Sequence, residues 1–424
     1  MTLADRRVLV GMSGGIACYK ACELVRQLRQ AGAAVHVVMT ENARQFVTPL
    51  TVQTLAGSPV ATDTFDLTQE STIGHIRLAD TADVVVLAPA TANLIAKMTH
   101  GIADDLLTTV LLATRAPIVV APAMNVHMWE HAATQENIQI LTRRGLRIVG
   151  PASGSLACGY EGAGRLADPM EIVEAAIVAV TPQDLVGEHV LVSAGPTREA
   201  IDPVRYLTNH SSGKMGYAIA RIARRRGATV TLVSGPVDLP APAGVRIVTV
   251  GSAREMDAAL RAEFRRATVL VMAAAVADYR PAVALDRKMK KSAGGRTLAL
   301  TRNVDIVTAL AKTKGHRTVV GFAAETHEVA AEARRKLREK GLDLIVANDV
   351  TAAGAGFGSD TNVVRLLDAR GLDESLPVLP KEEVAARILD WVIGRRRTGA
   401  RVRRRSSRGS GSRPRSTRGP RPSA

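Results

Sequence analysis

The chain begins a strand, a glycine-containing loop and a helix twice, and this repeated order constrains its fold more than any other feature. The first beginning is RVLVGMSGGIACYK at residues 7–20, and the second is VLVSAGPTREAIDPVRYLTNHSSGKMG at residues 190–216. An apolar run that leads into a polar, glycine-punctuated segment describes a strand feeding a phosphate-holding loop. The two loops differ in their residues, so we expect two α/β domains whose sites perform different chemistry.

Short runs of Val and Ile alternate with stretches rich in Ala, Leu and Arg, which is typical of parallel sheets that are buried on both faces. At 424 residues and 46% hydrophobic content, the chain can bury more than one core. We therefore expect two doubly wound, mostly parallel-sheet α/β domains. The predicted organisation is a flavodoxin-like domain at residues 1–180, a linker at 181–188 and a Rossmann-like domain at 189–394.

The residues from 395 to 424 are mostly Arg, Ser, Gly and Pro, from which no core can form, so we expect a disordered basic tail. Twelve Arg and no acidic residue lie in this stretch, which accounts for most of the formal net charge of +16. Such a tail favours salt-sensitive, sequence-indifferent contacts with nucleic acid. No module that reads bases accompanies it, so we expect nucleic-acid binding to be non-specific at most.

The three cysteines, Cys18, Cys22 and Cys158, are too few for a disulfide framework and suit a reducing cytosol. The N-terminal apolar stretch at residues 8–11 is too short for a signal sequence, and no stretch has the length of a membrane span. We expect a cytoplasmic protein with small-molecule substrates and no membrane partner.

Strands are predicted at residues 8–10, 83–88 and 118–121, and the last two lead directly into polar, proline-containing segments. In open α/β sheets, ligands bind beyond the carboxyl ends of the strands, so these segments are candidates for a site. Residues 11–16, GMSGGI, lack the G-x-G-x-x-G spacing, which disfavours an NAD-dependent oxidoreductase. The loop still offers backbone N–H groups, the Ser13 hydroxyl and a helix dipole to one phosphate, although a tight turn without a ligand explains it equally well.

Three further residues of the first half each have two interpretations. Asn125 follows a predicted strand and can be a helix N-cap, while His75 as a lone histidine is more often a surface residue. Cys158 can be a small apolar filler, but its glycine-rich surroundings favour an exposed thiol. Those surroundings, residues 151–165, predict a mobile loop that can fold over a ligand.

In the second half, residues 209–216 offer hydrogen-bond donors at the start of a helix, and Lys288, Lys290 and Lys291 offer positive charge from a loop. A triphosphate needs such cations, usually with Mg²⁺. A solvated lysine run is the alternative interpretation. Lys336 and Lys340 share one face of a predicted helix, where an ordinary amphipathic surface is again the alternative.

Several separate motifs occur together in the first half: Gly14-Gly15-Ile16, His75, the P-x-M-N-x-x-M-W element at 122–129, Ala157-Cys158-Gly159, Gly162 and Gly164-Arg165. In these residues the chain resembles the family of homo-oligomeric flavin-containing cysteine decarboxylases. With the second half included, residues 7–392 resemble the bacterial bifunctional phosphopantothenoylcysteine decarboxylases and phosphopantothenate-cysteine ligases of coenzyme A synthesis.

The resemblance implies that the first domain binds FMN. A flavin can oxidise the substrate thiol to a thioaldehyde, which provides the electron sink that loss of CO2 needs, and can then reduce the resulting enethiol. By the same resemblance His75 is the base, Asn125 orients the substrate carboxylate and amide, and Cys158 supplies a proton. The implied FMN contacts are Ser13, Gly14, Gly15 and Ile16 at the phosphate, and Thr40, Pro89, Ala90, Thr91, Ala92 and Asn93 near the ring.

For the second domain the resemblance implies a ligase that uses CTP and Mg²⁺ and forms an acyl-cytidylate, with Arg205, Asn209 and Lys288 on that intermediate. Val304 stands where the family pattern has Pro, so we expect a less rigid loop, with Asp305 available as a helix cap. The resemblance also implies trimers of the flavin domain, with His75 reaching a neighbouring site, and dimers of the ligase. The implied nucleotide contacts are Met272, Ala273, Ala274, Asp278, Lys288, Val304, Asp305, Ile306, Val307, Phe322, Lys336 and Lys340.

Overall fold

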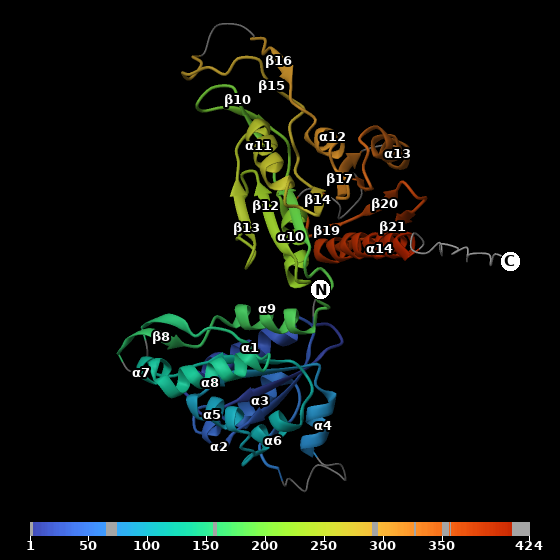
Figure 1. Ribbon diagram of the computed structural model, residues 1–424. Helices are drawn as coiled ribbons and strands as arrows, with labels where there is room; N and C mark the ends of the chain where they lie inside the picture. Colours follow the sequence, from blue (N-terminus) through green and yellow to red (C-terminus); the bar gives the residue numbers. More distant parts are fainter. Residues whose placement is uncertain are drawn as a thin grey trace, which may run out of the picture. The chain divides into compact units, whose positions relative to one another are not determined.

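The chain divides into two compact units, Met1–Pro182 (unit 1) and Gln183–Ala424 (unit 2), which Figure 1 shows as separate α/β bodies. The computed structural model describes residues 3–64, 74–155, 159–290, 296–325, 328–349, 356 and 358–408, with the backbone alone at 325, 349 and 397–408. Each unit is described separately below.

Unit 1 contains a six-stranded sheet with the order β3-β2-β1-β4-β5-β6, and every pair of neighbours is parallel. The order reverses between β1 and β4, as expected for a doubly wound fold. The strands are β1 (Arg7–Met12), β2 (Ala34–Met39), β3 (Val60–Ala61), β4 (Val84–Ala90), β5 (Ile118–Pro122) and β6 (Arg147–Ile148).

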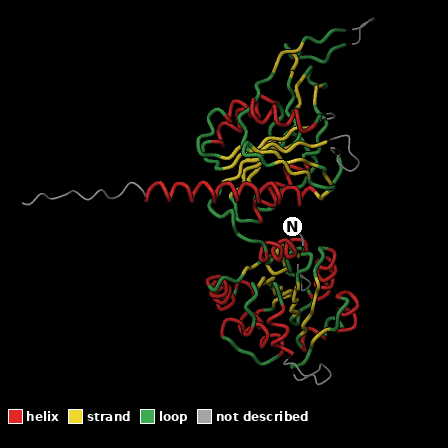
Figure 2. Tube along the Cα trace, turned by 90° about the vertical axis from the view of Figure 1, so that its right-hand side faces the viewer, coloured by secondary structure: helices red, strands yellow, loops and turns green. Residues whose placement is uncertain are grey.

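Helices cover both faces of this sheet, and Figure 2 shows its strands between them. Strand β4 is buried at every residue because apolar clusters pack against both of its faces. This explains why its sequence is a continuous apolar run. The helices are α1 (Cys18–Gln30), α2 (Glu41–Arg44), α3 (Pro49–Ala56), α4 (Gly74–Thr81), α5 (Ala92–His100), α6 (Leu106–Ala113), α7 (Val126–Glu130), α8 (Ala132–Arg143) and α9 (Pro169–Val180).

In the stretch at 151–165, predicted as a mobile loop, the described residues form a two-stranded antiparallel pair of β7 (Ala152–Ser155) and β8 (Glu161–Arg165), and residues 156–158 lie outside the described part of the chain. Gly154 and Gly162 lie close to neighbouring side chains, which sequence periodicity does not reveal. Gly162 has a φ of 150°, and a Cβ there would lie 2.8 Å from Cγ2 of Val126. The hairpin is therefore anchored next to α7.

Unit 2 contains an eight-stranded sheet with the order β13-β12-β9-β14-β17-β18-β20-β21. The first six strands are parallel, and β20 and β21 add an antiparallel edge. These strands are β9 (His189–Ala194), β12 (Thr229–Ser234), β13 (Arg246–Thr249), β14 (Val269–Met272), β17 (Thr318–Glu325), β18 (Leu344–Asp349), β20 (Val364–Asp368) and β21 (Asp373–Ser375). The predicted doubly wound, mostly parallel fold is thus confirmed in both units.

Further elements of unit 2 lie around this sheet. Four short strands, β10, β11, β15 and β16, form two antiparallel hairpins that extend from the sheet in Figure 1, and we call them the arm. The arm strands are β10 (Arg198–Ala200), β11 (Tyr206–Thr208), β15 (Tyr279–Pro281) and β16 (Leu300–Arg302). The remaining elements are α10 (Lys214–Arg225), α11 (Ala253–Phe264), α12 (Ile306–Ala311), α13 (Val329–Glu339), β19 (Thr361–Asn362), β22 (Leu379–Pro380) and α14 (Lys381–Arg408).

Helix α14 continues to Arg408 and so includes part of the stretch from residue 395 that was predicted to be disordered. Arg is a good helix former, and the first tail residues are also held by acids. Arg395 donates to Asp343 at 2.7 Å, and Nε of Arg396 donates to Glu188 at 2.7 Å. The predicted tail beyond residue 408 lies outside the described residues.

The segment predicted as a linker, 181–188, belongs to unit 2 from Gln183 onward. Asp184 pairs with Arg226 at 2.8 Å, and Leu185 is fully buried. The polar composition of this segment therefore reflects ion pairs to unit 2.

Candidate active sites

The first cavity lies in unit 1 at the carboxyl ends of β1, β4 and β5, beside the point where the strand order reverses. Its volume is about 590 Å³, which lies in the usual range for a small-molecule site. We call it the α1 cavity because the start of α1 forms one wall. It is lined by Gly14, Gly15, Ile16, Ala17, Tyr19, Lys20, Thr91, Ala123, Met124, Asn125, Met128, Ser155, Gly164, Arg165 and Leu166.

The backbone at the start of α1 is suited to hold an anion. The N–H groups of Gly14, Gly15 and Ile16 have no hydrogen-bond acceptor within the described part of the chain. No side chain caps the helix, since Ala17 occupies the N-cap position. Unpaired N–H groups and the positive end of the helix dipole together favour a phosphate at this place.

The Ser13 hydroxyl, predicted to contact the phosphate, does not line the cavity. Ser13 is buried, and its Oγ donates to the carbonyl of Pro89 at 2.8 Å and accepts from the N–H of Thr91 at 2.9 Å. It ties the loop after β1 to the loop after β4. In this way it holds Thr91, which does line the cavity, next to the glycines.

Asn125 combines the two interpretations that its sequence left open. It is the N-cap of α7, where its Oδ1 accepts from the N–H of His127 at 2.8 Å, and it also lines the α1 cavity. The preceding residue, Met124, donates its N–H to the carbonyl of Gly164 in the hairpin at 2.9 Å. This bond brings the hairpin residue Arg165 to the same cavity wall.

Of the residues predicted for this site, Gly14, Gly15, Ile16, Thr91 and Asn125 line the cavity. Thr40 instead caps α2, and His75 lies on α4 with a buried Nδ1 that has no hydrogen-bond partner among the described residues. Cys158 lies outside the described residues. The predicted contacts Ser13, Pro89, Ala90, Ala92 and Asn93 are not part of the cavity lining.

Tyr19 and Lys20 line the cavity but were not among the predicted site residues. The sequence could have indicated them, because they follow Ile16 by three and four residues and residues at this spacing share one face of a helix. Lys20 and Arg165 are the cationic residues in the lining.

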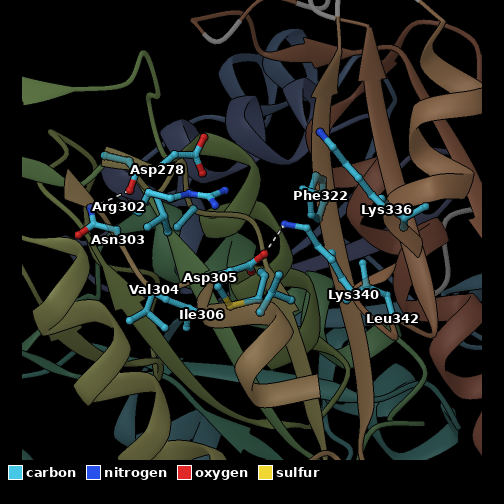
Figure 3. Close-up of a pocket in the computed structure, with 17 residues that line it drawn as sticks. Asp278, Arg302, Asn303, Val304, Asp305, Ile306, Phe322, Lys336, Lys340 and Leu342 are labelled. Carbon is cyan, nitrogen blue, oxygen red and sulfur yellow. Dashed lines mark hydrogen bonds and ion pairs between the residues drawn. The ribbon is translucent and has the colours of Figure 1, made fainter. Parts of the chain in front are cut away.

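A second cavity lies in unit 2 beside the start of α12, and we call it the α12 cavity. It has a volume of about 480 Å³ and contains nearly all the predicted nucleotide contacts. Figure 3 shows the ammonium of Lys340, the residue that follows α13, paired with Asp305 at the start of α12. The predicted residues in its lining are Met272, Ala274, Asp278, Val304, Asp305, Ile306, Val307, Phe322, Lys336 and Lys340.

Asp305 joins two walls of the α12 cavity. Its Oδ1 accepts from the N–H of Thr308, which confirms the predicted cap, and its Oδ2 pairs with Lys340 at 3.1 Å. Burial alone would raise the pKa of the Asp305 carboxyl, but the hydrogen bonds from Thr308 and Lys340 outweigh burial and lower it. The carboxylate is therefore ionised and holds Lys340 at the cavity edge.

The loop at Val304, predicted to be less rigid without proline, is fixed by the neighbouring Asn303. The Asn303 side chain donates to the carbonyl of Ala277 at 2.8 Å, and its backbone N–H donates to the carbonyl of Asp278 at 2.8 Å. Oδ1 of Asn303 accepts from Arg280 at 2.8 Å. These bonds hold the loop at the residue before Val304.

A third cavity of about 520 Å³ adjoins the second at the start of α10, and we call it the α10 cavity. Asn209, Lys214 and Ala273 are among its lining residues, and the Asn209 amide donates to the carbonyl of Val276 at 3.1 Å. The two cavities share the lining residues Ala274, Val276, Asp278, Phe322 and Lys336. Two ligands bound side by side can thus meet at these residues.

Arg205 and Lys288, predicted to contact the intermediate, line neither cavity of unit 2. Arg205 lies in the turn between β10 and β11 and donates to the carbonyl of Met289 at 3.0 Å, so the backbone next to Lys288 lies against this turn of the arm. Asp202 accepts from the N–H groups of Val204, Arg205 and Met289 and orders this corner.

Two negative findings concern the part of the chain that the structure describes. Its helices include none that is both long and apolar enough to cross a bilayer. Within the same residues, no three His, Cys, Asp or Glu side chains gather as a set of metal ligands.

The two units match two protein-family models. Residues 2–181 match the family described as Flavoprotein, and residues 185–395 match the DNA/pantothenate metabolism flavoprotein C-terminal domain. The chain thus joins a flavoprotein domain to a pantothenate-metabolism domain.

Curated relatives contain both domains. The coenzyme A biosynthesis bifunctional proteins CoaBC of Bacillus subtilis and Escherichia coli K12 are each 50% identical to this chain. The first match covers 94% of this chain and 100% of the relative, and the second covers 93% and 98%. A crystal structure of the C-terminal domain of a CoaBC protein is 42% identical and covers 51% of this chain and 99% of that chain, with a TM-score of 0.45. The chain belongs to the family of bifunctional coenzyme A biosynthesis proteins.

Proposed function

We propose that unit 2 joins 4'-phosphopantothenate to cysteine with CTP, and that unit 1 decarboxylates the resulting 4'-phosphopantothenoylcysteine to 4'-phosphopantetheine with FMN. The observation that carries the proposal is the pair of adjoining cavities in unit 2, combined with a separate anion-binding cavity in unit 1. A reaction that links an acid to a nucleotide needs two neighbouring sites, whereas a permanent cofactor needs one.

The residues of the α1 cavity fit FMN. The unpaired N–H groups at Gly14, Gly15 and Ile16 suit its phosphate, and the half-apolar walls formed by Met124, Met128 and Leu166 suit its ring. When bound, FMN supplies the electron sink and the reducing equivalents that the decarboxylation needs.

The protein's own residues hold and protonate the substrate in this proposal. Asn125 orients the substrate carboxylate and amide from the cavity wall, and Arg165 and Lys20 contribute positive charge. His75 is the base and Cys158 the proton donor. Because His75 lies on α4 and outside the cavity lining, it acts on the site of a neighbouring copy.

In unit 2, we assign the α12 cavity to CTP and the α10 cavity to 4'-phosphopantothenate. Lys336 lies in the lining that the two cavities share, where the acid attacks the α-phosphate and pyrophosphate leaves. Lys336 and Lys340, together with Mg²⁺, stabilise the charge that develops there. Asn209 orients the acyl group of the acyl-cytidylate.

We further propose that unit 2 forms dimers through the arm. The arm strands and the segments that connect them expose large apolar side chains, including Val204, Tyr206, Tyr279, Val283 and Leu300. A monomer rarely leaves such a patch in water, and a second copy would cover it while bringing Arg205 and Lys288 to a shared site. Trimers of unit 1 are the corresponding proposal for His75, and the expected location is the cytoplasm.

The proposal is tested by mixing the protein with 4'-phosphopantothenate, cysteine, CTP and Mg²⁺ and measuring CMP, CO2 and 4'-phosphopantetheine. We expect all three, and ATP in place of CTP should support much slower turnover. If the cysteine adduct formed without CO2, only the ligase half would stand.

Two variants test the assigned residues in this mixture. Cys158→Ser should release CO2 but stall before the reduced product, and Lys288→Gln should lose cysteine-dependent CMP release. Normal turnover by either variant would remove the role of that residue.

A further inference from the structure

The loop at residues 273–278, AAAVAD, supplies Ala274, Val276 and Asp278 to the lining that the two cavities of unit 2 have in common, and we call it the shared wall. Within the described part of the chain it belongs to no helix and, apart from one isolated bridge at Ala275, to no strand. Asp278 is its only polar side chain. The loop therefore depends on neighbouring residues to hold its backbone in place.

The segment that follows β9 binds the backbone of the shared wall. The carbonyl of Gly195 accepts from the N–H of Ala275 at 2.9 Å, and the N–H of Thr197 donates to the carbonyl of Ala275 at 3.3 Å. Thr197 adds a side-chain bond, since its Oγ1 accepts from the N–H of Ala277 at 3.0 Å. Thr197 is fully buried, so bulk water does not replace this bond if the hydroxyl is removed.

The backbone of Ala277 lies between two side chains from different parts of unit 2. Thr197 accepts from its N–H, and the Asn303 amide, next to the start of α12, donates to its carbonyl at 2.8 Å. The carbonyl of Thr197 in turn accepts from the Thr208 hydroxyl at 2.8 Å. Thr208 directly precedes Asn209, the residue assigned to the acyl group. Thr197 is thus connected to both the nucleotide side and the acyl side of the site.

The position of the shared wall determines how the two ligands of the proposed ligase reaction approach each other. The acid oxygen has to lie about 3–3.5 Å from the α-phosphorus, and a displacement of about 1 Å can lower a rate by about 100-fold. Binding is less sensitive, because most of the lining residues of each cavity lie outside the wall. A shift of the wall should therefore slow the reaction more than it weakens substrate binding.

We propose that Thr197 is a positioning residue of the ligase reaction, whose hydroxyl holds the shared wall at Ala277 and thereby sets the distance between the acid and the nucleotide. The inference rests on the proposed ligase function. Thr197 lines neither cavity, so it acts through Ala277 and not by contact with a substrate. Formation of the acyl-cytidylate takes place at this wall, so it is the step that depends on the hydroxyl.

The test measures pyrophosphate release by the full-length protein with 4'-phosphopantothenate, CTP, cysteine and Mg²⁺. Thr197→Val keeps the shape of the side chain but removes the acceptor. It should lower kcat by about 10- to 100-fold, the loss expected from a small displacement of the reacting groups, while the KM values for CTP and 4'-phosphopantothenate change little. Thr197→Ser keeps the hydroxyl and should recover most of the rate.

Thr231→Val is the matched control, because it also removes a buried threonine hydroxyl from unit 2. Thr231 is 1% exposed, and its Oγ1 bonds to Nε2 of His189 at 2.9 Å. This bond lies at the amino end of β9, whereas the shared wall follows the carboxyl end of the parallel neighbour β14. Thr231→Val should lower the urea midpoint of unit 2 about as much as Thr197→Val does but leave kcat at the wild-type value.

Thr208→Val is the second variant in case Thr197→Val does not fold, because Thr208 is exposed and donates its hydroxyl to the carbonyl of Thr197. It should lower kcat by a smaller factor, again with little change in KM. A wild-type kcat in whichever of these two variants folds would overturn the proposal, whether or not the KM for CTP is raised. If the wild-type protein released no pyrophosphate, the proposed ligase function itself would fail.

Discussion

Gly14 and Gly15 are neighbours in the loop before α1, but their surroundings differ. Neither has a positive φ, so alanine fits the backbone at both positions. A Cβ on Gly14 would lie 2.3 Å from Cβ of Asn42 and 2.8 Å from its carbonyl carbon, whereas a Cβ on Gly15 would meet only Cγ2 of Thr91, at 3.6 Å. The first contact cannot be relieved by rotating a side chain.

We therefore predict that Gly14→Ala destabilises unit 1 by about 1–3 kcal/mol, the usual cost of overpacking, and lowers the flavin content of the purified protein. Gly15→Ala is the matched control and should change stability by no more than about 0.5 kcal/mol. Thermal unfolding and flavin absorbance measure both effects. Equal behaviour of the two variants would show that the contact with Asn42 does not hold the loop.

The sequence indicated the residues of each site that belong to a local motif. The glycines before α1 and Asn125 after β5 could be predicted because each follows a strand directly, where ligands bind. Asn362 could not, since it lies in a two-residue strand and reaches the lining of the α10 cavity only in the folded unit. The positive charge of Arg205 and Lys288 made them candidates for a phosphate site, but their position on the arm depends on tertiary structure.

At the scale of elements, the ion pair between α14 and α10 illustrates how the last helix is held. Glu382, in the first turn of α14, pairs with Arg221 at 2.6 Å and with the buried Arg225 at 2.8 Å. Burial by itself would raise the pKa of the Glu382 carboxyl, but Arg225 and Arg221 outweigh burial and lower it. The carboxyl is thus more acidic in the folded than in the unfolded state.

A carboxyl of this kind stabilises the fold above its unfolded pKa of about 4.3, and the contribution is lost as the pH falls through the lower folded value. We predict that Glu382→Gln lowers the free energy of unfolding of unit 2 by about 2 kcal/mol at neutral pH. The difference from wild type should shrink in acid. Urea unfolding at neutral pH and again below the unfolded pKa measures it.

Glu383→Gln is the control for this prediction. Glu383 is exposed in the same helical turn and makes no ion pair in the described part of the chain, so its replacement removes the same charge near the helix start. It should cost only a few tenths of a kcal/mol. If both variants lost a similar free energy of unfolding, the loss would come from the interaction with the helix dipole and not from the ion pairs with Arg221 and Arg225.

The elements that the sequence predicted well are those buried on both faces. Strands β1, β4 and β5 lie where they were predicted because their apolar runs are continuous. The hairpin of β7 and β8 was missed because its glycines contribute close packing without a periodic apolar pattern. The arm strands were missed for a similar reason, since their apolar residues are exposed in the single chain.

For the whole molecule, the boundary between the units lies after Pro182, and the segment that follows it secures unit 2. Arg226, whose side chain is 4% exposed, pairs with both Asp184 and Asp390. Glu188 accepts from Thr268 at 2.5 Å and from Arg396 at 2.7 Å. Residues 183–188 thus complete two ion-pair networks at one edge of the unit 2 core.

The last prediction follows from these networks. A fragment of residues 183–424 should fold and release CMP in a cysteine-dependent manner, and a fragment of residues 1–182 should fold and retain flavin. A fragment that begins at residue 189 lacks Asp184, Leu185 and Glu188, which leaves the buried Arg226 with one acid. Breaking a buried ion pair costs about 3–5 kcal/mol, so this shorter fragment should unfold at a lower urea concentration than the fragment 183–424. Equal urea midpoints of the two fragments would show that residues 183–188 only link the units and do not stabilise unit 2.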